Sequence, residues 1–314
     1  MKTILVTGAT GYIGREFVKK YNKKYNLIAI VRETSDIVEL ELLKCKIVKF
    51  KNFKEIENVF NKNKIEGILH FASNVIVEHK EEEISRLVDS NIKYGTYLLE
   101  YCKQYNVKWF INTGTFWQNY NSDSYNPVNL YAATKEAFKN IAKYYTETSD
   151  LVFTTIKLND TFGTNDRRDK IFNLWNKISK TGETLEMSVG EQIIDISYIE
   201  DVLLAYDILI IYLNSDQKDE FKNKEFIVTN NEKYSLKELS KVFEETINTK
   251  LNIKWGARPY REREVMVPYS NGQIIPNWKQ NYTLKEAIKK TIGEKYYDTT
   301  RKTKTRDFTK NKRV

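Results

Sequence analysis

The chain has 314 residues, 41% of them apolar and 13% aromatic, which is enough for a folded core and excludes disorder throughout. Two cysteines, Cys45 and Cys102, exclude a disulfide framework, and the lack of a secretory signal or of an apolar run of about 20 residues predicts a cytoplasmic protein that makes no membrane contact. The formal charge is +9, but residues 297–314 contribute seven basic and two acidic side chains, so we interpret this segment as a disordered tail and expect no nucleic-acid partner.

The first half of the chain alternates short apolar runs with longer amphipathic segments. The apolar runs fall at 3–6, 27–31, 46–50, 67–72, 108–113 and 152–158, and each has the composition of a buried parallel strand. The segments between them, such as YIGREFVKKYNKK and LYAATKEAFKNIAKYY, have the character of helices. This alternation predicts an α/β fold with a doubly wound parallel sheet (Rossmann) in a dinucleotide-binding domain over 1–165.

Three glycines, Gly8, Gly11 and Gly14, follow the first predicted strand in the segment VTGATGYIG. A strand that turns directly into a helix leaves the first N–H groups of that helix unpaired, and a pyrophosphate satisfies them where no side chain blocks its approach. Gly8 would permit the tight turn, Gly11 the close approach and Gly14 the packing of helix on strand. The spacing is G-x-x-G-x-x-G rather than G-x-G-x-x-G, so a glycine-rich surface turn is the alternative to a dinucleotide site.

The end of the second strand distinguishes the two nicotinamide dinucleotides. An acidic residue there would accept hydrogen bonds from the ribose 2′-OH of NAD(H). The sequence instead has Val31 and Arg32, with no acid before Glu33, and a guanidinium suits a 2′-phosphate. We therefore favour NADP(H), and NAD(H) is possible if Arg32 is simply solvated.

Tyr131 and Lys135 lie four residues apart, on one face of a predicted helix. They follow the fifth strand, whose end carries the hydroxyls of Thr113 and Thr115, and strand ends line the ligand crevice of a doubly wound sheet. A nearby ammonium lowers the pKa of a phenol. Such a tyrosine can give a proton to a carbonyl oxygen while hydride reaches the carbon, or run the reverse.

After about residue 165 the alternation weakens. FIVTNN predicts a strand, and two helices begin with capping boxes, Ser235 with Glu238 and Thr283 with Glu286. We expect a smaller mixed C-terminal lobe that binds substrate, formed by 166–193 and 214–296, with 194–213 returning to the dinucleotide-binding domain.

Together these segments resemble the extended short-chain dehydrogenase/reductase family, which includes nucleotide-sugar epimerases, dehydratases and reductases. The resemblance covers about residues 1–295. It is carried by the segments TGATGYIG, GILHFAS, NIKYGTYLL, YAATK, KLNDTFG and DISYIEDVLLA, in that order. A narrower likeness, to reductases that make abequose- or paratose-type CDP-dideoxysugars, lies in NTGTFWQ and YNPVNLYAATK.

The resemblance implies a role for each matching residue. Tyr131 would be the acid–base residue, and Lys135 would orient the ribose and lower the tyrosine pKa. Thr113 would hydrogen-bond the substrate oxygen, with Thr115 as the second choice for this role. Asn91 would support the backbone of the active site. The implied cofactor-binding residues are Gly8, Gly11, Tyr12, Ile13, Gly14, Arg32, Asn52, Phe53, Phe71 and Ala72, and the implied substrate-binding residues are Thr115, Asn159 and Arg261.

Departures from the family pattern reduce the number of reactions that we expect this chain to catalyse. Dehydratases of the family carry an Asp-Glu pair after the active-site threonine, whereas Gly114 and Thr115 stand here, so we expect no dehydration. Ile194 replaces an arginine that binds the diphosphate of the sugar nucleotide. In the segment RPYREREVMVP, Arg261 and Glu264 best match an Arg-x-x-acid pattern of the family. The alternative interpretation is that this segment is an exposed run of ion pairs.

Two further features bear on ligands. The acid that the family places beside adenine is missing, with Lys51 and Asn52 in its place. His70 falls in a predicted buried strand and His79 among charged residues, and neither has a second ligand nearby, so we expect no metal site.

Three hypotheses follow. The first is NADPH-dependent reduction of a 4-keto-deoxysugar nucleotide at C4. The second is a nucleotide-sugar 4-epimerase that holds NAD, and the third is a non-enzymatic dinucleotide-binding protein. We also expect a homodimer, formed through the helices IKYGTYLLEYCKQY and ATKEAFKNIAKYY, although their apolar stripes could be covered within the monomer.

Overall fold

The computed structural model describes residues 1–43 and 45–293, so the predicted basic tail at 297–314 lies outside the described residues. The chain divides into two compact units. Unit 1 comprises Met1–Asn159, Val202–Thr229 and Arg263–Trp278, and unit 2 comprises Asp160–Asp201, Asn230–Glu262 and the described residues from Lys279 on. In the described part of the chain, no helix has both the length and the apolar composition needed to cross a membrane.

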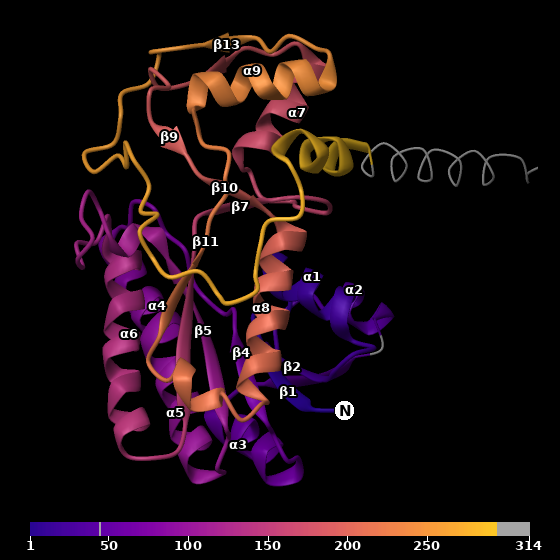
Figure 1. The fold of residues 1–314 in the computed structure, drawn as a ribbon, viewed down its shortest axis with the longest axis vertical. Helices are drawn as coiled ribbons and strands as arrows, with labels where there is room; N and C mark the ends of the chain where they lie inside the picture. The colour runs from indigo at the N-terminus through magenta and orange to yellow at the C-terminus, as the bar shows by residue number, and fades with distance from the viewer. Residues whose placement is uncertain (44, 294–314) are drawn as a thin grey trace, which may run out of the picture. The chain divides into compact units, whose positions relative to one another are not determined.

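Unit 1 is built on a seven-stranded sheet with the order β11-β6-β5-β4-β1-β2-β3, in which every neighbouring pair is parallel (Figure 1). The order reverses between β1 and β4, and in such sheets ligands bind outside the carboxyl ends of the strands at this point. The predicted doubly wound sheet is confirmed. The strands are β1 (Thr3–Thr7), β2 (Asn26–Arg32), β3 (Lys46–Phe50), β4 (Gly67–His70), β5 (Trp109–Thr115), β6 (Val152–Leu158) and β11 (Glu225–Val228).

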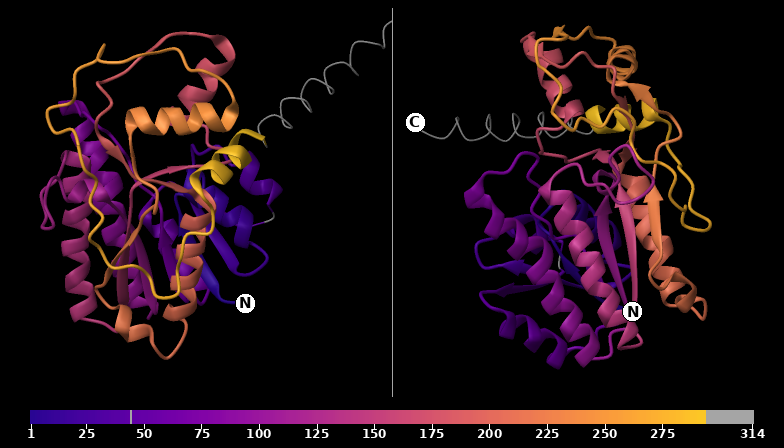
Figure 2. Two further views of the ribbon diagram at one scale, coloured as in Figure 1. Left: turned by 45° about the horizontal axis from the view of Figure 1, so that its top comes forward. Right: turned by 90° about the vertical axis from the view of Figure 1, so that its left-hand side faces the viewer.

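Helices cover both faces of this sheet, and Figure 2 shows α8 on the opposite side from α5 and α6. On the face of α3, α5 and α6 a core cluster joins strand residues such as Leu5 and Phe110 to Leu98 of α5 and Phe138 of α6. On the other face, the Tyr21 hydroxyl of α1 donates to a carbonyl oxygen of α8. The helices are α1 (Tyr12–Tyr21), α2 (Val38–Leu42), α3 (Phe53–Lys62), α4 (Ile84–Val88), α5 (Tyr94–Gln104), α6 (Leu130–Glu147) and α8 (Ile199–Leu213).

Unit 2 has three short two-stranded ladders, β10-β7, β12-β9 and β13-β8, and helices that share an aromatic core. Phe243 lies 5.3 Å from Phe172 and 5.5 Å from Trp175, measured between ring centroids. Both predicted capping boxes form, at Ser235 and Thr283. The elements are β7 (Asp160–Phe162), α7 (Ile171–Thr181), β8 (Leu185–Glu186), β9 (Ile193–Ile194), β10 (Ile196–Tyr198), β12 (Tyr234–Ser235), α9 (Leu236–Ile247), β13 (Ile253–Lys254) and a helix over 284–293.

The grouping of the C-terminal segments differs from the boundaries that the sequence pattern favoured. Residues 214–229 and 263–278 belong to unit 1, and the segment 194–201 belongs to unit 2. The apolar run of β11 explains the first difference. Phe226, Ile227 and Val228 are all buried because β11 pairs with β6 and extends the main sheet.

Candidate active site

Tyr131 is held at the start of α6. The side chain of Asn129 accepts a hydrogen bond from the Ala132 backbone N–H and so caps the helix one residue before it begins. Tyr131 is buried beside the hydroxyls of Ser73, which follows β4, and Thr115, at the end of β5. Burial raises the pKa of Tyr131 to about 12, and the two hydroxyls oppose this rise. The phenol is therefore protonated at neutral pH.

The hydrogen bonds around Ser73 have a fixed direction. Asn91 Oδ1 accepts the backbone N–H of Asn74 at 2.7 Å, and Asn91 Nδ2 donates to the Asn74 carbonyl oxygen and to Thr134 Oγ1, both at 3.0 Å. The Ser73 hydroxyl donates to Asn91 Oδ1 at 3.2 Å. Asn91 holds the backbone at Asn74, which matches the supporting role that the resemblance implied.

The second hydroxyl of β5, Thr113, contacts a different phenol. Thr113 Oγ1 lies 2.7 Å from the hydroxyl of Tyr206, which is fully buried on α8. Burial raises the pKa of Tyr206, with Tyr131 close enough to raise it further, while Thr113 lowers it. Phe71, after β4, packs its ring edge-on against Tyr206 at 4.8 Å. Tyr206 is thus a further buried tyrosine close to Tyr131, and the sequence pattern did not indicate it.

Lys135 lies one turn after Tyr131 and is 1% exposed. Burial lowers the pKa of Lys135 to about 8. The side chains that lower the pKa of Tyr131 in this structure are Ser73 and Thr115. The charge of Lys135 instead lowers the pKa of His70. His70 is buried as expected, with Nδ1 2.9 Å from Thr7 Oγ1, and burial together with the Lys135 charge holds the pKa of His70 well below its usual value.

A cavity of about 540 Å³ opens at the carboxyl ends of β1, β2 and β4, and all of its lining residues belong to unit 1. Ser73, which lies beside the phenol of Tyr131, lines this cavity, whereas Tyr131 itself is not one of its lining residues. Six predicted cofactor residues line it: Gly8, Gly11, Arg32, Phe53, Phe71 and Ala72. It is also lined by Thr10, Ile30, Val31, Ser35, Phe50, Ser73, Asn74, Arg86, Asp89, Ser90 and Tyr94.

The glycine turn fits the roles that the spacing predicted. Gly8 has φ +66°, and a Cβ on it would lie 2.5 Å from the Ala72 backbone nitrogen. A Cβ on Gly14 would lie 2.3 Å from the Gly8 carbonyl oxygen, so only glycine lets α1 approach the turn this closely. Gly11 ends the turn as the N-cap of α1. A backbone turn without side chains at the start of a helix suits the pyrophosphate of a dinucleotide.

The remaining predicted residues have other surroundings. Tyr12 is buried and Ile13 half-buried in α1. The side chain of Asn52 caps α3 by accepting the Glu55 N–H at 3.1 Å. Asn159 is buried with Oδ1 lacking a hydrogen-bond partner, and Arg261 is exposed in unit 2.

Sequence reasoning missed Ser73 and Tyr206. The signal for Ser73 was present, because it ends the segment GILHFAS that carries part of the family resemblance. Tyr206 gave no such signal, since it lies within the apolar run VLLAYDILIIYL. Its role depends on α8 packing against the sheet beside Phe71, a contact between residues 135 positions apart.

Comparison with known proteins gives one family. Residues 4–223 match the model of the NAD dependent epimerase/dehydratase family. The chain is 26% identical over 300 residues to a CDP-abequose synthase of Salmonella muenchen, covering 94% of this chain and 98% of that protein. It is 27% identical over 272 residues to a CDP-abequose synthase of Yersinia pseudotuberculosis, covering 84% and 91%. In fold it resembles a UDP-glucose 4-epimerase from Thermotoga maritima solved with UDP-glucose, with a TM-score of 0.80 at 20% identity over 95% of this chain and 99% of that one.

Proposed function

Because the chain belongs to the NAD dependent epimerase/dehydratase family, and is thus an enzyme of nucleotide-sugar metabolism, we propose that it reduces C4 of a 4-keto-deoxysugar nucleotide with NADPH. The observation that carries this proposal is the cavity at the glycine turn, whose lining residue Ser73 lies beside the buried, protonated phenol of Tyr131. This arrangement supports hydride transfer coupled to proton donation.

The residues around the phenol have distinct parts in this reaction. A bound nicotinamide dinucleotide supplies the hydride that adds to the carbonyl carbon. Tyr131 donates its proton to the carbonyl oxygen, which becomes the C4 hydroxyl, and Thr113 holds that oxygen by a hydrogen bond. Lys135 orients the ribose from the next turn of α6. The protonated phenol is the form that donates in the reduction.

The preference for NADPH rests on the end of β2. Arg32 lines the cavity together with Ser35, and Glu33, the acid that follows Arg32 in the sequence, forms an ion pair of 2.9 Å with Lys51. A guanidinium and a hydroxyl suit a 2′-phosphate, and β2 ends in Arg32 rather than in an acid that would accept a hydrogen bond from the 2′-OH of NADH.

The choice of substrate rests on the relatives and on Gly114. Two relatives of nearly the same length are CDP-abequose synthases, which supports a nucleotide-linked deoxysugar. Dehydration is disfavoured because Gly114 and Thr115 stand in place of the acid pair. We propose that Asn159, whose Oδ1 has no partner, and Arg261 bind the substrate. In this proposal Asn159 and Arg261 hold the substrate and take no part in the transfer of hydride or of the proton.

The test is coenzyme consumption by the purified protein. We expect one NADPH to be oxidised per molecule of a CDP- or dTDP-linked 4-keto-6-deoxysugar, with much slower oxidation of NADH. An epimerase would instead interconvert sugar nucleotides with coenzyme retained from purification and none added. That second outcome would replace the reductase proposal.

A further inference from the structure

The hydroxyl of Thr113 has a buried partner that the reaction described above does not use. Thr113 Oγ1 lies 2.7 Å from the hydroxyl oxygen of Tyr206, and by chemistry either oxygen can donate in this hydrogen bond. Tyr206 is fully buried, whereas Thr113 is half-buried. A ligand can therefore reach the threonine but not the tyrosine, so an effect of the Tyr206 hydroxyl on a substrate has to pass through Thr113.

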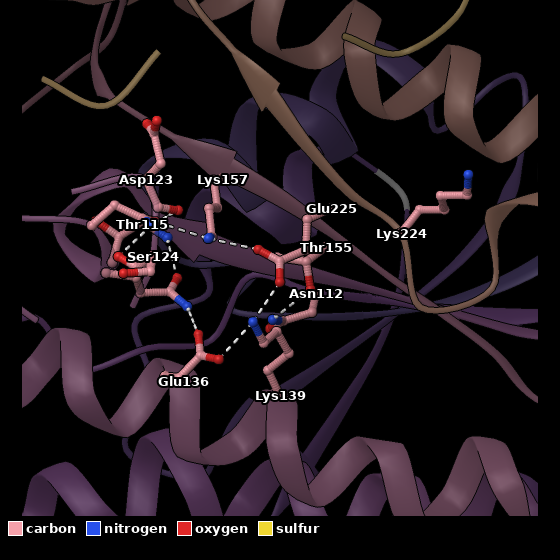
Figure 3. Close-up of polar contacts among 12 residues, drawn as sticks. Asn112, Thr115, Asp123, Ser124, Glu136, Lys139, Thr155, Lys157, Lys224 and Glu225 are labelled. Atoms are coloured by element: carbon pink, nitrogen blue, oxygen red, sulfur yellow. Dashed lines mark hydrogen bonds and ion pairs between the residues drawn. The ribbon is translucent and has the colours of Figure 1, made fainter. Parts of the chain in front are cut away.

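The two faces of β5 separate this contact from the other polar groups of the strand. Successive side chains of a strand point to opposite faces of the sheet. Phe110 packs against α6, and Asn112, two residues on, donates to Thr155 Oγ1 at 3.2 Å on the same face (Figure 3). Thr113 points the other way, to the face that α8 covers, where Tyr206 is its partner. The groups around Asn112 therefore do not orient the Thr113 hydroxyl.

Helix α8 is fixed to its neighbours on either side of Tyr206. The hydroxyl of Tyr21 donates to a carbonyl oxygen of α8 three residues before Tyr206. Asp207, the next residue, accepts from the Tyr25 hydroxyl and from Lys24 Nζ, each at 2.7 Å. These contacts hold the helix that carries the phenol, so the fold of unit 1 sets where the Tyr206 oxygen lies along β5.

The ring of Tyr206 has a separate contact with the wall of the dinucleotide cavity. It packs edge-on against Phe71, with 4.8 Å between the ring centroids, and Phe71 lines that cavity. A phenylalanine at position 206 would keep this packing, because the hydroxyl takes no part in it. Tyr206→Phe therefore removes the contact with Thr113 and leaves the support of the cavity wall.

The burial of Tyr206 determines which oxygen donates. Among the described residues, Thr113 Oγ1 is the one hydrogen-bond partner of the Tyr206 hydroxyl. If the threonine donated, the phenol hydrogen would be buried without an acceptor, which is unfavourable. Donation by Tyr206 satisfies the phenol, and it leaves the threonine hydrogen for a ligand.

We propose that Tyr206 is a positioning residue, which donates to Thr113 Oγ1 and so leaves the threonine hydrogen to donate to the carbonyl oxygen of the substrate. That oxygen can only accept, and it gains negative charge as hydride adds to its carbon, so a donor held in place stabilises the transition state. Tyr206 touches neither substrate nor coenzyme. The inference rests on the proposed function in that Thr113 holds the oxygen at C4.

The first test is a double-mutant cycle in the reductase assay. We expect Tyr206→Phe to lower kcat about fivefold with KM within about twofold, because a donor without its restraint costs more in the transition state than in binding. Thr113→Val removes the hydroxyl through which Tyr206 acts. In that background Tyr206→Phe should cost less than about twofold more, and an equal cost in both backgrounds would contradict the proposal.

Two further variants separate positioning from damage to α8. Tyr25→Phe removes another buried phenol hydroxyl that bonds the same helix, and it should lower Tm as Tyr206→Phe does while leaving kcat unchanged. An equal loss of kcat in both variants would overturn the positioning role. Thr113→Ser keeps an oxygen that accepts from Tyr206, so it should restore most of the activity that Thr113→Val loses. A serine variant as slow as the valine variant would likewise contradict the proposal.

A readout without turnover distinguishes failure of this inference from failure of the proposed function. With 3-fluorotyrosine incorporated at position 206 alone, the ¹⁹F resonance reports on the hydrogen bond of that phenol, and no Tyr206→Phe variant is needed. We expect Thr113→Val to shift the resonance, and Thr113→Ser to leave it close to that of the wild type. An unmoved resonance in Thr113→Val would refute the positioning role whatever the activity. If the resonance shifts as expected and the enzyme reduces no 4-keto sugar nucleotide, the proposed function fails and the hydrogen bond stands.

Discussion

Tyr131 is the residue on which the proposed chemistry depends, because it is the buried phenol beside Ser73 and Thr115. Tyr131→Phe removes the proton donor and leaves the glycine turn intact. We expect kcat to fall by about 10²–10⁴, the usual range for a lost general acid, with NADPH binding unchanged. Steady-state kinetics and a fluorescence titration of NADPH measure the two effects. Turnover close to that of the wild type would remove Tyr131 from the mechanism.

Arg32 decides the choice of coenzyme in our proposal. Charge-assisted hydrogen bonds contribute about 1.5–3 kcal/mol each, so Arg32→Ala should weaken NADPH binding by roughly 10- to 100-fold. NADH binding should change by less than about threefold, because NADH has no 2′-phosphate. Calorimetric titration with both coenzymes measures this difference. Equal losses for the two coenzymes would indicate that Arg32 supports the fold of the cavity and does not select the phosphate.

At this scale the sequence predicted residues that lie in motifs and missed those that depend on distant packing. Tyr131, Lys135 and the glycines were found because local spacing identifies them. Tyr206 was not, since its partner, Thr113, lies 93 residues away. No periodicity reveals such a pair. The prediction that Lys135 lowers the pKa of Tyr131 likewise depended on the distance between the two side chains, which the sequence does not give. In this structure Ser73 and Thr115 lower that pKa instead.

Helix α1 tolerates no larger residue at position 14, because Gly14 packs against the turn that precedes the helix. A methyl group at position 14 would lie 2.3 Å from the Gly8 carbonyl oxygen. Gly14→Ala should therefore displace the start of α1 and weaken NADPH binding by at least about tenfold. Gly293→Ala, where nothing lies within 4 Å of the added methyl group, is the control and should bind normally. Normal binding by Gly14→Ala would mean that the turn is not the pyrophosphate site.

The strands of the first half were predictable because each is a nearly continuous apolar run bounded by polar residues. β11 was recognised as a strand but not assigned to the main sheet. Its partner, β6, ends 67 positions before it begins, and the intervening segment contains the Asp160–Asp201 part of unit 2. Composition identifies a strand, while its neighbour is set by the path of the whole chain.

The stability of the whole molecule should carry a signature of the buried lysine. The pKa of Lys135 is lowered from 10.5 to about 8, so between these values the unfolded chain binds a proton that the folded protein does not. Stability must therefore rise with pH across this window, by roughly 3 kcal/mol in total. Below pH 8 the folded protein bears the cost of a buried charge.

Urea denaturation at pH 7 and pH 10 tests this. In the difference between wild type and Lys135→Met, contributions from other groups cancel. The wild type should gain stability relative to the variant as the pH rises. A constant difference would show that Lys135 keeps its ordinary pKa in the folded enzyme.

The exposed face of α5 and α6 leads to a prediction about assembly. Tyr97 of α5 is 40% exposed and Tyr144 of α6 58%, and Lys103 lies over the Tyr144 ring at 5.1 Å, so the two helices present aromatic groups to solvent together. Sedimentation velocity should show a dimer, and Tyr97→Glu with Tyr144→Glu should convert it to a monomer. Leu42→Glu, at an exposed position on α2, should leave the dimer intact.

Because α6 also carries Tyr131 and Lys135, the activity of the monomeric variant tests whether the dimer supports the active site. α6 carries Tyr131 and Lys135 on its buried side and Tyr144 on its exposed side, so a partner packed on the exposed side would restrain the helix that places the phenol. We therefore expect the monomeric variant to lose activity mainly in kcat. A monomeric wild type with full activity would show that α6 needs no such restraint, and that the packing of Phe138 within its own chain is sufficient.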